Sequence, residues 1–169
     1  MKLNLNYLFL GIFLTSIFAC NNVDNTSSTS NTSPNEPINI QFIKEGELEL
    51  INNDSIIRKI DIELAKSDNK RAIGLMNRNS LEENQGMLFI FQEDNHSGFY
   101  MKDTRIALDI IFLGQDSTVI SISKNRQPFD MRSEGASEPY RYVLEINAGK
   151  SDEWGIEEGL TKINWIETK

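Results

Sequence analysis

The chain has 169 residues, of which 39% are hydrophobic and 25% are charged, and its formal net charge is −8. These proportions are typical of one globular domain with a packed core. The acidic balance and the absence of a Lys/Arg cluster argue against nucleic acid as a partner. They also argue against binding to an anionic membrane by charge alone.

The N-terminus resembles the signal peptide of a bacterial lipoprotein. Lys2 precedes an apolar run from Tyr7 to Ala19, which at about a dozen residues is too short for a transmembrane helix of roughly 20. The only cysteine, Cys20, directly follows Ala19. We expect residues 1–19 to be a signal peptide and Cys20 to carry lipid, so that the membrane is a partner. The alternative is an uncleaved anchor with an incidental cysteine.

The N-terminal sequence predicts where the protein is located and how the chain is divided into segments. A lipidated Cys20 places the protein in the bacterial cell envelope as a membrane-anchored lipoprotein that faces the periplasm or the cell surface. Residues 20–37 are rich in Asn, Ser and Thr and predict a disordered tether. Residues 38–169 form the predicted domain. With a single cysteine, no intrachain disulfide and no Cys-based zinc site can form.

Alternation of apolar and polar residues predicts many short strands in this domain. Turn residues at Asn52–Ser55 and at Gly114–Ser117 separate some of them. The predicted strands cover residues 38–42, the region of Leu48 and Leu50, 60–64, 87–91, 106–113, 119–123, 140–146, and the region of Ile163 and Trp165, with one helical turn at 151–155.

One longer helix is predicted between the third and fourth of these strands. Ser67 or Asp68 can cap its start. An apolar stripe then runs through Ala72, Ile73, Leu75 and Met76, and Gly74 within it indicates a close approach of backbones. Many strands with one main helix predict an α+β fold, a β-rich curled sheet or small barrel.

Several motifs occur in order along the domain: Arg71, Gly74–Met76, Arg78, Leu81, Gly86–Phe89, Phe91, Phe99–Thr104, Leu108–Ile110, Phe112, Tyr142–Glu145 and Gly149. Together they resemble the DUF192 family, also called UPF0127. The resemblance spans about Ile60 to Gly159 and implies a small β-rich domain, often exported or lipid-anchored, with no established biochemical function. The family usually has Trp-Met-Lys-Asn-Thr at residues 100–104 and Pro-Leu-Asp at 107–109, where this chain has Tyr-Met-Lys-Asp-Thr and Ala-Leu-Asp.

The sequence gives little support for a catalytic site of a known type. The domain has no cysteine and its only histidine is His96, which a Ser-His-Asp site would need. His96 could share a metal ion with Glu93 and Asp94, but their spacing favours a solvated turn. No Gly-rich phosphate loop is present. We therefore predict no catalytic residue, no metal and no cofactor.

The best polar cluster lies where a polar segment enters an apolar strand. Lys102, Asp103, Thr104 and Asp109 could form the polar floor of a ligand pocket with Phe99 and Tyr100 as its walls. Their convergence requires a turn or bulge near Asp103–Thr104. In the alternative, Asp109 is a structural acid bonded to Lys102, to an arginine or to backbone N–H groups, because an isolated buried charge is costly.

Glu145 is the last candidate residue for this ligand site. Like Asp109, it could contact a ligand or be a structural acid. The favoured function is non-catalytic binding of a small polar or glycan-like ligand, or of a protein partner. One alternative is a hydrolase that uses Asp109 and Glu145 as paired carboxylates, and another is a purely structural envelope module. Trp154 and Trp165 could stack on sugar rings or serve only in packing.

Overall fold

The computed structural model describes residues 40–168. Within them no helix is both long and apolar enough to cross a membrane. The predicted signal peptide, lipidated Cys20 and tether lie outside the described residues. The elements are β1 (Gly46–Asn52), β2 (Ser55–Ala65), α1 (Asp68–Ile73), β3 (Gln85–Asn95), β4 (Leu108–Leu113), β5 (Val119–Arg126), β6 (Tyr140–Asn147), α2 (Lys150–Glu153) and β7 (Lys162–Glu167).

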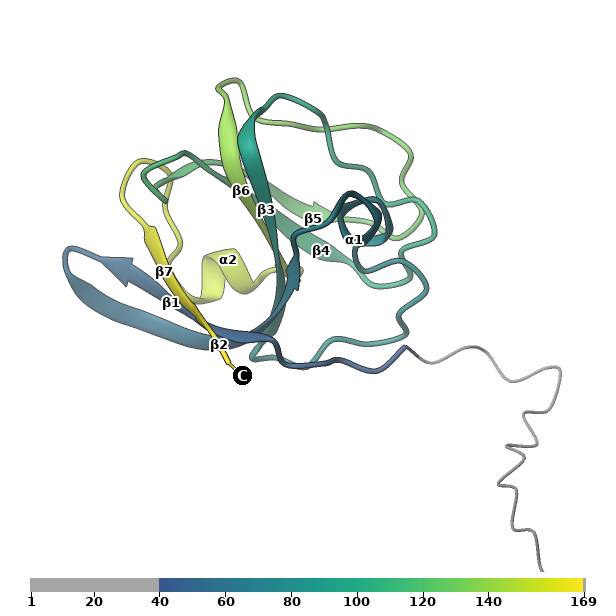
Figure 1. Ribbon diagram of the computed structural model, residues 1–169, viewed down its shortest axis with the longest axis horizontal. Helices are drawn as coiled ribbons and strands as arrows, with labels where there is room; N and C mark the ends of the chain where they lie inside the picture. The colour runs from purple at the N-terminus through teal and green to yellow at the C-terminus, as the bar shows by residue number, and fades with distance from the viewer. Residues whose placement is uncertain (1–39, 169) are drawn as a thin grey trace, which may run out of the picture. The chain divides into compact units, whose positions relative to one another are not determined.

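The strands form one seven-stranded sheet in the order β5-β4-β6-β3-β2-β1-β7. The pairs are antiparallel except β2 with β3, which is parallel and is connected through α1. The sheet curls so strongly that its two edge strands meet at one end, where the amide of Val119 donates to the carbonyl of Thr161 at 2.8 Å (Figure 1). The predicted β-rich curled sheet is confirmed.

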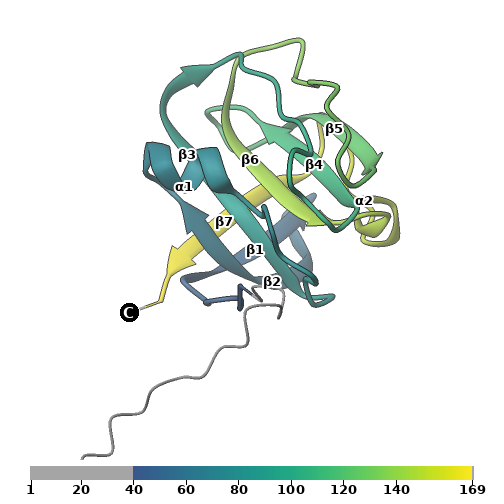
Figure 2. The ribbon, with the colours of Figure 1, turned by 90° about the vertical axis from the view of Figure 1, so that its right-hand side faces the viewer.

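The two faces of the sheet carry separate hydrophobic clusters. The inner cluster receives side chains from all seven strands and from Trp154 beside α2. The outer cluster is centred on Phe89, Phe112 and Tyr140 and includes Leu75 and Met101 from the connections after α1 and β3. Figure 2 shows the course of α1 and of these connections. Strand alternation assigns neighbours to opposite clusters, so Leu88 is in the inner one and Phe89 in the outer one.

The predicted main helix is much shorter than expected. Ser67 caps α1 as predicted, because its Oγ accepts from the amide of Lys70 at 3.3 Å. The helix ends after six residues at Ile73, and none of its residues is buried. Gly74 ends it by adopting a φ of 50°, which an L side chain rarely adopts, so Leu75 reaches the core from the turn that follows.

The start of the domain also differs from the expectation. Ile38 lies outside the described residues, and residues 40–45 form no strand, since β1 begins only at Gly46. A buried ion pair holds this segment instead: Arg78 contacts Glu63 at 2.5 Å, Glu63 accepts from the amide of Ile43 at 2.7 Å, and Arg78 donates to the carbonyl of Gln41 at 3.3 Å. The remaining predicted strands and the helical turn are present, but two strands are much longer than predicted: β2 begins at Ser55, before the predicted 60–64, and β3 continues to Asn95, beyond the predicted 87–91.

Candidate ligand-binding cavity

A cavity of about 250 Å³ opens over the outer face of the sheet. We call it the Glu145 cavity. Three segments line it: residues 71–76 at the end of α1, the rings of Phe89 and Phe91 on β3, and the loop residues Asn95, Ser97–Tyr100 and Thr104. Glu145 on β6 is the only carboxylate among the lining residues.

Glu145 lies in this wall, and none of residues 40–168 donates a hydrogen bond to its Oε2. Glu145 is only 6% exposed, and its Oε2 atom is itself buried. Its cross-strand neighbours are Met87 on β3 and Ile110 on β4, which carry no charge. Burial alone raises the pKa of Glu145 from 4.5 to about 8, because the charged form loses its hydration. An acid without compensation inside a fold is a typical feature of a functional site.

Arg71 is the only basic residue that lines the cavity, and its guanidinium is engaged elsewhere. It donates to the carbonyl of Ile90 at 2.9 Å and to that of Lys66, and it forms an ion pair with Asp68. It also lies over the ring of Phe91, 5.1 Å from the centroid. Arg71 therefore shapes the wall of the cavity and leaves Glu145 uncompensated.

The predicted turn between the polar segment and β4 is present. The amide of Thr104 donates to the carbonyl of Met101 at 3.2 Å, and Asp103 adopts a φ of 54°. This turn buries Met101 and Thr104 and leaves Lys102 and Asp103 exposed. Of the predicted ligand-binding residues here, Tyr100 and Thr104 line the cavity, while Lys102 and Asp103 do not. A four-residue turn directs its two central side chains outward, which the expectation of convergence overlooked.

Asp109 is fully buried and serves the structure. Its Oδ1 accepts from the amide of Asn125 at 2.8 Å, and its Oδ2 accepts from the amide and hydroxyl of Ser151 at 2.9 and 2.7 Å. These bonds tie β4 to the end of β5 and to α2. These bonds agree with the structural interpretation of Asp109, with two backbone N–H groups among the donors, and neither Lys102 nor an arginine supplies any of them.

The proposed carboxylate pair of a hydrolase does not form. Asp109 lies opposite Ile146, and Glu145 lies opposite Ile110, on the paired strands β4 and β6. Ile146 belongs to the inner cluster and Ile110 to the outer one, so the two acids point to opposite faces of the sheet. They cannot act on one substrate in one cleft, and Asp109 lies outside the Glu145 cavity.

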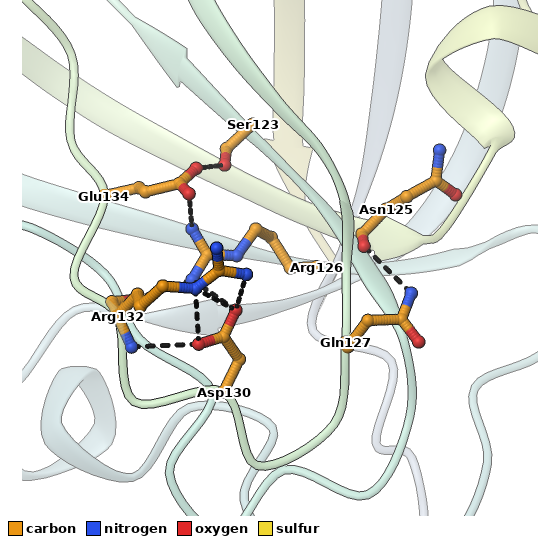
Figure 3. A network of polar contacts seen from close by, with 7 residues as sticks. All are labelled: Ser123, Asn125, Arg126, Gln127, Asp130, Arg132 and Glu134. Atoms are coloured by element: carbon orange, nitrogen blue, oxygen red, sulfur yellow. Dashed lines mark hydrogen bonds and ion pairs between the residues drawn. The ribbon is translucent and has the colours of Figure 1, made fainter.

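A second polar cluster surrounds Arg126 at the end of β5 (Figure 3). Its guanidinium contacts Glu134 at 2.5 Å and Asp130 at 3.4 Å, and donates to the carbonyl of Arg132 at 2.6 Å. The pKa of Asp130 is lowered to about 2, chiefly by hydrogen bonds from Arg132. These mutual contacts fix the connection between β5 and β6, so we assign the cluster to structure.

Two other candidates from the sequence, Trp154 and Asp94, make contacts within the protein. Trp154 is 8% exposed within the inner cluster, with Arg58 over its ring at 4.9 Å, so it offers no face to a sugar. Asp94 pairs with Arg141 at 2.9 Å. Within residues 40–168 no group of three or more His, Cys, Asp or Glu side chains is placed to hold a metal ion.

From the sequence we placed Phe99 and Tyr100 in the wall of the site but missed the rings that β3 contributes, Phe89 and Phe91. Phe89 and Phe99 meet edge to face at 5.1 Å between ring centroids, and both line the cavity. The alternation in β3 could have placed Phe89 and Phe91 on one face with Met87. No local pattern indicates that the loop around Phe99 folds onto that face.

The fold and the site together define a class of protein: a curled β-sheet domain with a small, partly aromatic cavity whose wall carries the buried acid Glu145. The sequence profile of DUF192, described as an uncharacterized ACR, matches residues 49–164. The chain belongs to the DUF192 family. A comparison with curated proteins gives no match.

Two solved structures are similar. A protein of unknown function from Novosphingobium aromaticivorans is 34% identical, with a TM-score of 0.67 over 70% of this chain and 84% of that one. A Sinorhizobium meliloti protein, which bears the name of a proposed transcription regulator, is 30% identical, with a TM-score of 0.68 over 74% of this chain and 98% of that one.

Proposed function

We propose that this chain is a lipid-anchored domain of the cell envelope that binds a small ligand, without catalysis, in the Glu145 cavity. The observation that carries the binding role is the carboxylate of Glu145, whose Oε2 is buried without a partner at the wall of a cavity of about 250 Å³. The anchoring part rests on the sequence of residues 1–20.

The cavity favours a compact ligand. Its volume lies below the roughly 300–1,000 Å³ of pockets for drug-sized molecules, and much of its wall is aromatic. Such a site suits a molecule of about one ring better than an extended glycan. The lining offers no nucleophile paired with a base, since Glu145 is the only carboxylate and no histidine or cysteine is present. These features support binding over catalysis.

The test is whether a molecule is retained in the cavity. Ala72 is exposed on α1 and lines the cavity, so Ala72→Trp should plug it without disturbing the core. Asn69→Trp, also exposed on α1 but outside the cavity, is the matched control. In native mass spectrometry of the gently purified chain, we expect a bound small molecule in the wild type and in Asn69→Trp, and its loss in Ala72→Trp. Identical spectra for all three would favour the purely structural alternative.

A further inference from the structure

We propose that the ligand of the Glu145 cavity is an organic ammonium ion whose charged nitrogen meets the Glu145 carboxylate and whose apolar body packs on the rings of Phe89 and Phe99. This inference rests on the proposed function and adds the chemical class of its ligand. It follows from what the cavity supplies and from what it lacks.

The cavity supplies one uncompensated acid. Glu145 is 6% exposed and none of the described residues donates a hydrogen bond to its Oε2. A buried carboxyl without a partner costs stability in either protonation state, since a neutral acid lacks its hydrogen bonds and an ionised one lacks a counter-charge. A ligand that brings N–H donors and a positive charge removes both penalties at once.

The other charged groups near the cavity do not provide that counter-charge. Arg71 is bound to two backbone carbonyls and to Asp68. On the same face, Glu63 lies across Met87 from Glu145, and it is neutralised by Arg78 at 2.5 Å. Tyr100 is the only other ionisable residue of the lining. The position for a cation beside Glu145 is thus left to the ligand.

The aromatic wall suits the same ligand. The rings of Phe89 and Phe99 meet edge to face, with an interplanar angle of 84°. Aromatic faces attract cations such as alkylammonium ions, and they also bury apolar carbon atoms. Where Glu145 is ionised, above its pKa of about 8, an anion would be repelled both by the carboxylate and by the negative ring faces. A neutral alcohol would gain the apolar contacts but would leave the acid without a charge partner.

Proton linkage gives the inference a distinctive signature. Burial raises the pKa of Glu145 to about 8, whereas an alkylammonium group titrates near 10.4, as lysine does. Below pH 8 an ammonium ligand must therefore displace a proton from Glu145 when it binds. Its affinity should rise about tenfold per pH unit between pH 6 and pH 8 and then level off. The affinity of a neutral ligand should not follow this course.

The probes are benzylammonium, benzyl alcohol and benzoate, which share one ring and differ in charge. Each is titrated by saturation-transfer NMR against the full chain in phosphatidylcholine nanodiscs, with empty nanodiscs as the blank. At pH 8 we expect benzylammonium to bind more tightly than benzyl alcohol by about tenfold or more. For so small a molecule its Kd should be about 1 mM. Benzoate should bind weakest.

Two variants connect the preference to Glu145. Glu145→Gln should reduce benzylammonium affinity about tenfold or more and abolish its pH dependence, while benzyl alcohol binding changes little. Glu93→Gln, on exposed β3 surface outside the cavity, makes the same charge change and should have no effect.

The outcomes separate this inference from the proposed function. Equal affinity for benzylammonium and benzyl alcohol, blocked by Ala72→Trp in both cases, would overturn the ammonium class and still support a small-ligand cavity. A preference for benzylammonium that survives Glu145→Gln would also overturn it. Absence of binding by every probe overturns the inferred class, whereas the proposed function is decided by the retained molecule and its loss in Ala72→Trp.

Discussion

Asp109 and Glu145 lie on paired strands, one position out of register, and point to opposite faces of the same sheet. Asp109 faces inward and accepts three hydrogen bonds from Asn125 and Ser151. Glu145 faces outward and its Oε2 has no partner. The two buried acids thus differ, because the fold supplies donors to Asp109 and none of residues 40–168 supplies one to the Oε2 of Glu145.

Replacing Asp109 by Asn should destabilise the domain by about 3 kcal/mol, because an amide nitrogen would face a buried N–H or hydroxyl donor. Urea unfolding of both proteins measures this difference. The control is Asp103→Asn, where the side chain is exposed and Asn tolerates the φ of 54°, so the change should stay within about 0.5 kcal/mol. Similar losses in both variants would contradict the structural role of Asp109.

Glu145 should make the stability of the domain fall as pH rises. Its pKa is raised by burial from 4.5 to about 8, so the folded state holds a proton that the unfolded state releases between these values. The associated stability is fully present below about pH 4.5 and is lost by about pH 8.

Glu145→Gln removes this dependence. We expect the variant to be more stable than the wild type by up to about 5 kcal/mol at pH 8.5 and nearly equal to it at pH 4.5. Urea unfolding across this range measures the difference. Using the difference between the two proteins cancels the opposite contributions of surface acids such as Asp130, whose pKa is lowered. Parallel stability curves would show that Glu145 ionises normally in the folded state.

Gly74 should be hard to replace because it combines two constraints. Its φ is 50°, and a Cβ there would lie 3.0 Å from Cζ of Phe89 and 3.8 Å from Oε2 of Glu145. Gly74→Ala should therefore cost about 2–3 kcal/mol in unfolding experiments. Gly159→Ala shares a positive φ of 74° but meets no atom within 4 Å, and should cost only about 1 kcal/mol. If both substitutions lower the free energy of unfolding equally, the contact of the new Cβ with Phe89 does not contribute to the loss.

Lipid anchoring predicts that Cys20→Ala moves the protein from the membrane pellet to the soluble fraction, because the acyl chains provide the attachment. Fractionation of cells that express either form, followed by immunoblotting, measures the change. Labelling with a radioactive fatty acid should mark the wild type and leave the variant unlabelled. A variant that remains in the pellet would show that the apolar segment from Tyr7 to Ala19 is itself the anchor.

The sequence by itself determined much of the sheet. Alternating residues such as Ile60, Ile62 and Leu64 identify strands because the side-chain period of two is a local property of extended backbone. The Asp109 carboxylate within an apolar run likewise required satisfied hydrogen bonds. The helix length was misjudged, since an apolar stripe continued past Gly74, whose positive φ ends α1.

Only the tertiary structure decided where the site lies. Alternation divides a strand into two faces but does not say which face becomes the interior of a curled sheet. The register of β4 with β6 placed Asp109 and Glu145 on opposite faces, and the fold of a distant loop brought Phe99 to the cavity that Glu145 lines. The donors to Asp109 come from residues 16 and 42 positions away. These contacts arise from the pairing of β4 with β5 and from the position of α2 against the sheet, which no local pattern encodes.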